Sequence, residues 1–396
     1  MPLSDKLTSS LSAFAHAVFA RPLTDAQADN IAGRVIDTLA CMAAAAHEGA
    51  TKPVVQALML AGGQGACPVL FAGATALTQA ATANSYLSRC LDWNDTYIGK
   101  NGGHPSDIIA GAITTGAWAG KNGDRILRAI AAGTHAMMDL CDSADAMSRG
   151  WDHATYVGLA ATIANGLLLD LDEEQLGHAI AMTAVSNNVL VSRYGKISTW
   201  KSLASPAAVR TAIENCLLAR AGATGPDPVF EGDNGFMNRI SGLLAPELDA
   251  ARDRTGDTHL KPYQAVYHAQ APIELALRLR DEIMAGHGSP PEAGFVDRAH
   301  VTTYSFGIKH AADNAAKWKP ETPETADHSI PFLVALALAR GGVDHASLAG
   351  AINDEKVLAL TARVSISADA EMDATFPQRS PAKLLVRAGG RTFIAE

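Results

Sequence analysis

Basic clusters, paired cysteines and long apolar runs are all missing from this sequence, and each absence argues against a class of protein. The formal net charge is −9, and no cluster of lysines and arginines opposes it. This charge argues against nucleic acid or an anionic membrane as a partner. No uninterrupted apolar run of about 18 residues occurs, so we expect no membrane span. The early stretch LSAFAHAVFA contains His16 and follows one lysine, which favours a first helix over a secretion signal.

The five cysteines are scattered, and no two of them form a CxxC pair. Their spacing supports neither a zinc site nor a three-cysteine iron–sulfur site. We therefore expect small buried thiols in a reduced, cytoplasmic protein. The cysteines concerned are Cys41, Cys67, Cys90, Cys141 and Cys216.

Apolar residues and alanine are plentiful. Hydrophobic residues make up 48% of the 396 residues and charged residues 18%, which is enough to bury a large core in one or two domains. Helical periodicity runs through residues 1–255, for instance in TDAQADNIAGRVIDTLACMAAAA, with Thr24 or Asp25 as a cap. SPAAVRTAIENCLLARAGA predicts a helix that starts near Pro206 and closes at Gly222.

Strand patterns appear only later in the chain. HVTTYSF, LALTARVSISADA and AKLLVRAGGRTFIAE are β-rich or alternate in polarity, the last with a turn at Gly389-Gly390. Helical stretches lie between them. The sequence thus predicts a mostly α protein with a large all-α domain over residues 1–255 and a smaller α+β domain over residues 256–396.

The segment LDWNDTYIGKNGGHPSDIIAG gathers polar groups ahead of an apolar run. Pro105 suits the first position of a helix, which puts His104 at the N-cap. The helix dipole and free N–H groups there favour an anion and a neutral imidazole. On a helix, Asp92 and Thr96 would share one face, and the Gly102-Gly103 pair would form a turn before His104. The alternative is an ordinary junction with a capping histidine.

Two further segments carry candidate groups in the helical part. His153 in RGWDHATYVG precedes an apolar run and is expected near a helix N-terminus, as a cap or a site residue. Lys196 and Lys201 precede the helix predicted at Pro206, where a cation is unfavourable unless an anion lies between them. Solvated loop lysines are the alternative.

The stretch THLKPYQAVYHAQ carries Lys261, Tyr263 and His268 at the expected domain boundary, where ligand sites are common. Hinge residues exposed to solvent are the alternative. In ADHSIPF, Ser329 marks a helix start, and we interpret His328 as structural.

Six segments in this order resemble the MmgE/PrpD family, and they cover most of the chain. They are LDWNDTYIGKNGGHPSD, RGWDHATYVG, GKISTWKSLASPAA, TGPDPVFEGDNGF, KPYQAVYHAQAPIELAL and KWKPETPETADHSIPF. The resemblance implies a helical domain with an α+β lid domain, a homodimer, and neither metal nor cofactor. It implies catalytic roles for Asp92, His104, His153 and Lys201, and substrate binding by Thr96, Lys261, Tyr263 and His268.

Within that family, the motifs DWNDTY and WKS resemble those of the 2-methylcitrate dehydratases. The resemblance then implies a metal-independent lyase that dehydrates a small hydroxy-tricarboxylate by acid–base catalysis, while lysines bind the carboxylates. A cis-aconitate-type decarboxylase, an epimerase of a dicarboxylate and an impaired ligand-binding member are the alternatives. Two departures from the family pattern are Thr134-His135, where a Tyr-Glu-like pair is expected, and a chain that stops at RTFIAE.

Overall fold

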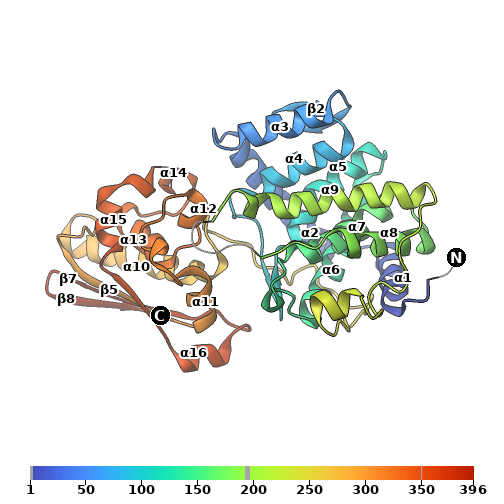
Figure 1. The fold of residues 1–396 in the computed structure, drawn as a ribbon. Coiled ribbons are helices and arrows are strands. Elements are labelled where there is room, and N and C mark those ends of the chain that lie inside the picture. The colour runs from blue at the N-terminus through green and yellow to red at the C-terminus, as the bar shows by residue number, and fades with distance from the viewer. Residues whose placement is uncertain (1–2, 192–196, 349) are drawn as a thin grey trace. The chain divides into compact units, whose positions relative to one another are not determined.

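The computed structural model describes residues 3–191, 197–348 and 350–396, which form two compact units. Unit 1 comprises Met1–Ser192 and Ser202–Leu260, and unit 2 comprises Arg193–Lys201 and Lys261–Glu396. The predicted fold class is confirmed, because the first unit is largely helical and the second combines helices with a sheet (Figure 1).

Unit 1 is built from long helices that pack side by side. The central pair, α6 (Gly123–Ser143) and α7 (Ala154–Leu168), is buried along most of its length. Capping supports the predicted helices: Thr24 forms a capping box with Gln27 at the start of α2. The other helices of this unit are α1 (Lys6–Ala20), α2 (Asp25–Ala46), α3 (Lys52–Gly62), α4 (Leu77–Arg89), α5 (Ile109–Trp118), α8 (Glu173–Ser186) and most of α9 (Trp200–Arg220).

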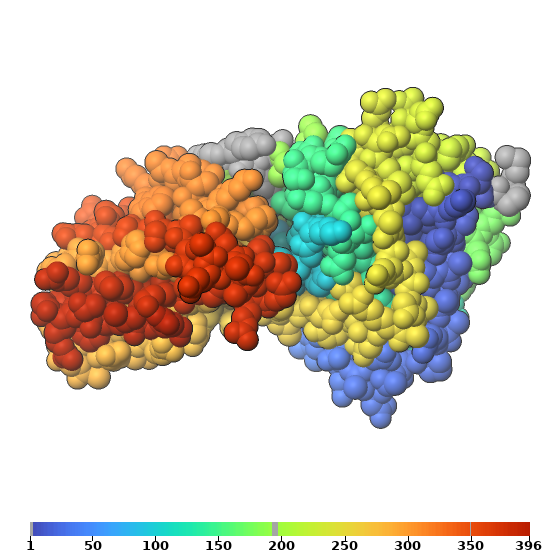
Figure 2. Space-filling view, turned by 90° about the horizontal axis from the view of Figure 1, so that it is seen from below, coloured from blue at the N-terminus to red at the C-terminus, as the bar shows by residue number. Residues whose placement is uncertain are grey.

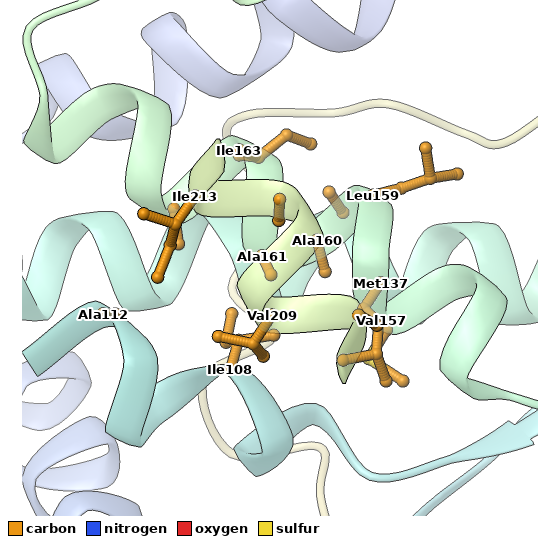
Figure 3. Packing of buried hydrophobic residues seen from close by; sticks show 14 of the residues in the cluster. Ile108, Ala112, Met137, Val157, Leu159, Ala160, Ala161, Ile163, Val209 and Ile213 are labelled. Carbon is orange, nitrogen blue, oxygen red and sulfur yellow. The ribbon is translucent and has the colours of Figure 1, made fainter. Parts of the chain in front are cut away.

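Small residues let the central helices approach closely. Figure 3 shows Ile108, Met137, Val157 and Val209 converging around Ala160. A Cβ added at Gly133 of α6 would lie 2.8 Å from the Ala160 carbonyl oxygen. Four of the five cysteines are buried, as expected for small buried thiols, and none of the five forms a disulfide.

Short elements and one long irregular segment complete unit 1. β1 (Cys67–Val69) pairs with β2 (Gly73–Thr75), and β3 (Tyr97–Ile98) pairs with β4 (Gly102–Gly103). Short helical turns are η1 (Pro105–Ile108), η2 (Met147–Arg149) and η3 (Met237–Ser241). The chain after η3 crosses the surface of this unit as the yellow band in Figure 2.

The helix predicted to start at Pro206 starts earlier, so that prediction is wrong. α9 begins at Trp200 and carries Pro206 inside it. The backbone N–H of Lys201 donates to Ser198, and the Lys201 side chain forms a buried ion pair with Asp327, which together favour the additional turns. Lys201 therefore lies in a helix rather than in the preceding loop, and Lys196 lies outside the described residues.

Unit 2 contains a mixed sheet in the order β6-β5-β7-β8, where only β5 (Val296–Thr303) and β6 (Val364–Ala368) are parallel. The predicted hairpin of β7 (Ala382–Ala388) and β8 (Arg391–Ala395) is confirmed. Gly389 and Gly390 both have positive φ, which a tight hairpin turn of this twist requires. Alternate β7 residues, Leu384 and Val386 among them, point into the core.

Two helices, α10 (Gln270–His287) and α13 (Ile330–Arg340), pack on each other and on the sheet (Figure 1). Because α13 is buried through Leu338, its apolar sequence belongs to the core of this unit. The remaining elements are η4 (Tyr267–Ala269), α11 (Ser305–Ala311), η5 (Ala315–Lys317), α12 (Pro323–Ala326), α14 (His345–Leu348), η6 (Ala351–Asn353), α15 (Glu355–Thr361) and α16 (Ala370–Thr375).

Within the described ranges, no single helix is long and apolar enough to cross a membrane. One pair, Ile330–Arg340 with His345–Asn353, satisfies length and composition only when joined across a bend of 103°.

Two helix-interior glycines provide a matched test of the packing. We expect Gly133→Ala to lower the free energy of unfolding by about 1–3 kcal/mol, because its new methyl group would collide with backbone of α7. Gly33→Ala in α2 meets nothing within 4 Å and should raise it by about 0.5–1 kcal/mol. Urea unfolding measures both, and equal effects of the two exchanges would contradict the packing argument.

Candidate active site

A guanidinium buried in unit 1 organises the first group of candidate residues. Arg89 ends α4 and is fully buried. Its Nη1 forms an ion pair with Asp92, and its Nε lies 3.8 Å from Oδ1 of Asp107. Asn94 donates to the same Asp107 oxygen at 2.9 Å. A charge that arginine cannot give up is thus offset by two buried carboxylates.

His104 sits at the N-cap of η1, with Pro105 next to it, as the sequence predicts. Its Nδ1 lies 2.6 Å from the carbonyl oxygen of Asp95, and its Nε2 lies 3.2 Å from Nη2 of Arg89. A carbonyl only accepts hydrogen bonds and a guanidinium only donates them. Both contacts are therefore satisfied by a neutral imidazole that carries its hydrogen on Nδ1.

His153 lies beside carboxylates, whereas His104 lies beside a guanidinium. It is the N-cap residue of α7, as expected, and its ring centroid lies 5.1 Å from that of His104. Its Nδ1 lies 2.9 Å from Asp152, and its Nε2 lies 3.5 Å from Asp107 and 3.3 Å from the Ser205 hydroxyl. A carboxylate at each ring nitrogen favours the protonated imidazolium.

The loop after α4 differs from the predicted helix. Asp92 has φ 51°, which ends helical geometry, so Asp92 and Thr96 do not share a helix face. Thr96 instead exchanges backbone hydrogen bonds with His259, and its hydroxyl lies 3.3 Å from Nδ1 of His104. Both predicted residues still reach His104, Thr96 directly and Asp92 through Arg89.

Gly102 and Gly103 form a strand rather than the predicted turn, because they pair with Tyr97–Ile98. A Cβ at Gly103 would lie 2.7 Å from Cε of Met137 and 3.9 Å from Cβ of His153. A larger residue at Gly103 would therefore require the end of the Met137 side chain to move. Asp95 contacts the start of η1, because its carboxylate accepts from the Ser106 N–H at 3.0 Å, and burial raises the pKa of that carboxyl.

Unit 2 holds the second group of candidate residues, centred on Lys201. Its side chain is fully buried, and Nζ lies 3.1 and 3.2 Å from the two carboxylate oxygens of Asp327. The same Nζ lies 3.2 Å from Nδ1 of His328, which in turn lies 2.5 Å from Asp327. His328 is therefore part of the polar cluster around Lys201, and its interpretation as structural stays a prediction.

His268 lies in the same unit, where its ring packs against aromatic side chains that include Tyr304 and Phe376. Burial lowers its pKa to about 3, and the charges of His310, His328 and Lys261 lower it further. Burial also raises the pKa of Tyr304, whose hydroxyl lies 2.6 Å from Nδ1 of His268. The neutral His268 ring carries one N–H donor and one acceptor nitrogen, and its Nδ1 shares a hydrogen bond with the Tyr304 hydroxyl.

Lys261 is buried, and its charge acts on His268. Tyr263 differs from the other candidates, because its hydroxyl donates to Glu274 at the surface. Lys317 is a further buried lysine of this unit, and its pKa is lowered by burial but raised by Asp313 and Asp327. Three buried lysines, Lys201, Lys261 and Lys317, therefore lie in this unit.

Several buried charged residues that hold the candidate side chains were not predicted from the sequence. Arg89, Asp107 and Asp152 contact the two histidines, and Asp327 contacts Lys201. Arg89 lies in NSYLSRCL, a stretch of mixed polarity that does not mark the arginine as buried. The identity of its partner is not visible in the sequence.

Two family models match the chain. The MmgE/PrpD N-terminal domain matches residues 9–248, and the MmgE/PrpD C-terminal domain matches residues 263–396. The chain belongs to the MmgE/PrpD family. The resemblance found in six sequence segments is thereby confirmed.

The curated relatives of this MmgE/PrpD protein are distant. It is 24% identical over 324 residues to 2-methylcitrate dehydratase of Escherichia coli (strain K12), with 75% of this chain and 64% of the relative covered. It is 26% identical over 380 residues to 2-methylcitrate dehydratase of Cupriavidus necator, with 88% and 74% covered. For mitochondrial 2-methylcitrate dehydratase of Yarrowia lipolytica the identity is 25% over 276 residues, with 64% and 51% covered. The chain thus spans less than two thirds of the length of the Escherichia coli and Yarrowia lipolytica relatives.

The buried Lys201–Asp327 pair predicts a stability effect. We expect Lys201→Met to lower the free energy of unfolding by about 3–5 kcal/mol, because Asp327 would remain buried beside an apolar side chain. Lys356→Met, which removes a lysine from an exposed pair with Glu292, should change it little. Chemical denaturation of both variants checks this, and equal losses would contradict the role of burial.

The low pKa of His268 predicts a pH effect. Between pH 6.5 and about 3 the unfolded chain binds a proton that folded His268 does not, so stability falls as the pH drops through this range. This histidine contributes a slope of up to about 1.4 kcal/mol per pH unit. We expect His268→Gln to flatten the decline measured by urea unfolding between pH 7 and pH 4. An unchanged slope would show that His268 titrates normally.

Proposed function

We propose that this MmgE/PrpD protein is a hydro-lyase that dehydrates a small hydroxy-tricarboxylate, with 2-methylcitrate as the foremost candidate. The observation that carries the proposal is the pair of histidines in opposite electrostatic surroundings. His104 faces a guanidinium, and His153 lies between two carboxylates, with their ring centroids 5.1 Å apart. Groups whose surroundings favour opposite protonation states are suited to act as base and acid.

In this mechanism His104 is the base and His153 is the acid. His104 takes a proton from the carbon beside a carboxylate, through its unprotonated Nε2. The electrons of that C–H bond form the new double bond, and the C–O bond to the hydroxyl breaks. His153 donates a proton from Nε2 to the leaving hydroxyl, which departs as water. Loss of the proton from His104 and reprotonation of His153 then restore both groups.

Cations are needed because the proton removed is only weakly acidic and negative charge develops beside a carboxylate. Lys201 and Lys261 are the buried lysines proposed to supply positive charge, and neutral His268 the hydrogen-bond donor. Thr96 and Tyr263 remain proposed substrate-binding residues. Such local positive charge would allow an acidic protein to bind an acidic substrate.

The relatives named 2-methylcitrate dehydratase support this choice of substrate. Since the chain spans only 64% of the length of the first of them, the activity is tested directly. Purified protein is incubated with 2-methylcitrate, citrate and cis-aconitate. Appearance of an unsaturated tricarboxylate from either hydroxy acid is the expected result. Release of CO₂ from cis-aconitate would identify a decarboxylase, and binding without turnover would contradict an enzymatic role.

The two histidines give the sharpest prediction of this mechanism. We expect His104→Gln and His153→Gln to lower kcat on 2-methylcitrate by about 100-fold or more, since each exchange removes one proton-transfer group. His47→Gln, the same exchange at an exposed position of unit 1, should leave kcat unchanged. Circular dichroism confirms that the variants fold. A rate close to that of the unmodified protein in either site variant would remove that residue from the mechanism.

A further inference from the structure

The only ring nitrogen of His104 that has a lone pair is covered by Arg89. Nδ1 donates to the carbonyl oxygen of Asp95, and the Thr96 hydroxyl lies close to the same nitrogen. Nε2 lies 3.2 Å from Nη2 of Arg89. The base assigned above is therefore in the correct tautomer, but its reactive atom already accepts a hydrogen bond.

Arg89 is held in place on several sides. It belongs to the last turn of α4, it is fully buried, and its Nη1 and Nε face Asp92 and Asp107. Asp92 and Asp107 thus stabilise the buried charge, while Nη2 reaches His104.

Further groups face the His104 ring. They include the Asp95 carbonyl and the Thr96 hydroxyl from the loop after α4, and the ring of His153 from the start of α7. Asp92 and Asp107 reach it through Arg89. Protonation of Nε2 would turn its N–H toward the N–H groups of a fixed cation, which disfavours the imidazolium.

We propose that Arg89 is a positioning residue that holds His104 in the neutral Nδ1–H form with Nε2 covered, until a substrate carboxylate takes over the hydrogen bond from Nη2. The second half of the proposal rests on the proposed function. A carboxylate accepts a charge-assisted hydrogen bond from Nη2 that is stronger than the one to a neutral imidazole. A ligand with a carboxylate near Arg89 would therefore uncover the base, and the enzyme would acquire its reactive form only when the substrate is present.

The test uses ¹⁵N-histidine-labelled full-length protein, with the His104 signals assigned by their loss in His104→Gln. In the unmodified protein near neutral pH we expect a protonated Nδ1 and an Nε2 shift typical of a hydrogen-bond acceptor. The variant Asp92→Asn is compared with the double variant Arg89→Met/Asp92→Asn. The two differ only in the guanidinium, and neither contains a buried Asp92 carboxylate that has lost its cation. The double variant should move Nε2 to the shift of a free acceptor and raise the pH at which His104 titrates. Arg89→Lys keeps the charge without the fork and should give an intermediate result.

The ligand step is tested with citrate as the probe. Saturating citrate should move Nε2 of the unmodified protein toward the free-acceptor shift and leave the Arg89→Met/Asp92→Asn variant unaffected at that atom. The tautomer assignment is overturned if His104 carries its hydrogen on Nε2, or if removing Arg89 changes neither shift nor titration. Citrate that binds without moving Nε2 overturns the uncovering step. These readouts need no turnover, so inactivity toward every hydroxy acid would refute the proposed function while the tautomer result stands.

Discussion

The charge of the Arg89 guanidinium is permanent, and the candidate site of unit 1 is arranged around this constraint. Burying such a charge is tolerable only when carboxylates and acceptors surround it. Asp92 and Asp107 meet that requirement, and His104 completes the set as an acceptor. Asp107 also lies beside His153, so one carboxylate links the neutral histidine and the histidine that favours a proton. Arg89 beside His104, and Asp107 with Asp152 beside His153, give the two imidazoles their different chemical characters.

Unit 2 also buries charged groups together. Lys201 and Lys317 both interact with Asp327, and Asp313 is a second carboxylate that acts on Lys317. Neutral His268 adds a donor without adding charge, because burial and neighbouring cations keep it unprotonated. This arrangement agrees with a family whose relatives include dehydratases of a tricarboxylate.

Patterns that depend on neighbours along the chain were predictable. The capping box at Thr24, the Gly389-Gly390 hairpin and the N-cap positions of His104 and His153 all follow from local chemistry. The start of α9 was not predictable, because it depends on the ion pair of Lys201 with Asp327, which lies more than a hundred residues later in the chain. The contact of His328 with Lys201 spans a similar separation and was not predictable either. Distant ion pairs decide these features, and a single sequence does not contain the pairing.

The backbone at Asp92 has a consequence for how this protein can change. With φ 51° the position disfavours most side chains, and asparagine and glycine are the residues that tolerate it best. Neither carries the negative charge that offsets Arg89. Glutamate would keep the charge but not the backbone preference. Substitution of Asp92 is therefore restricted both by its backbone conformation and by the charge that Arg89 requires. Each of these exchanges meets one of the two requirements and fails the other.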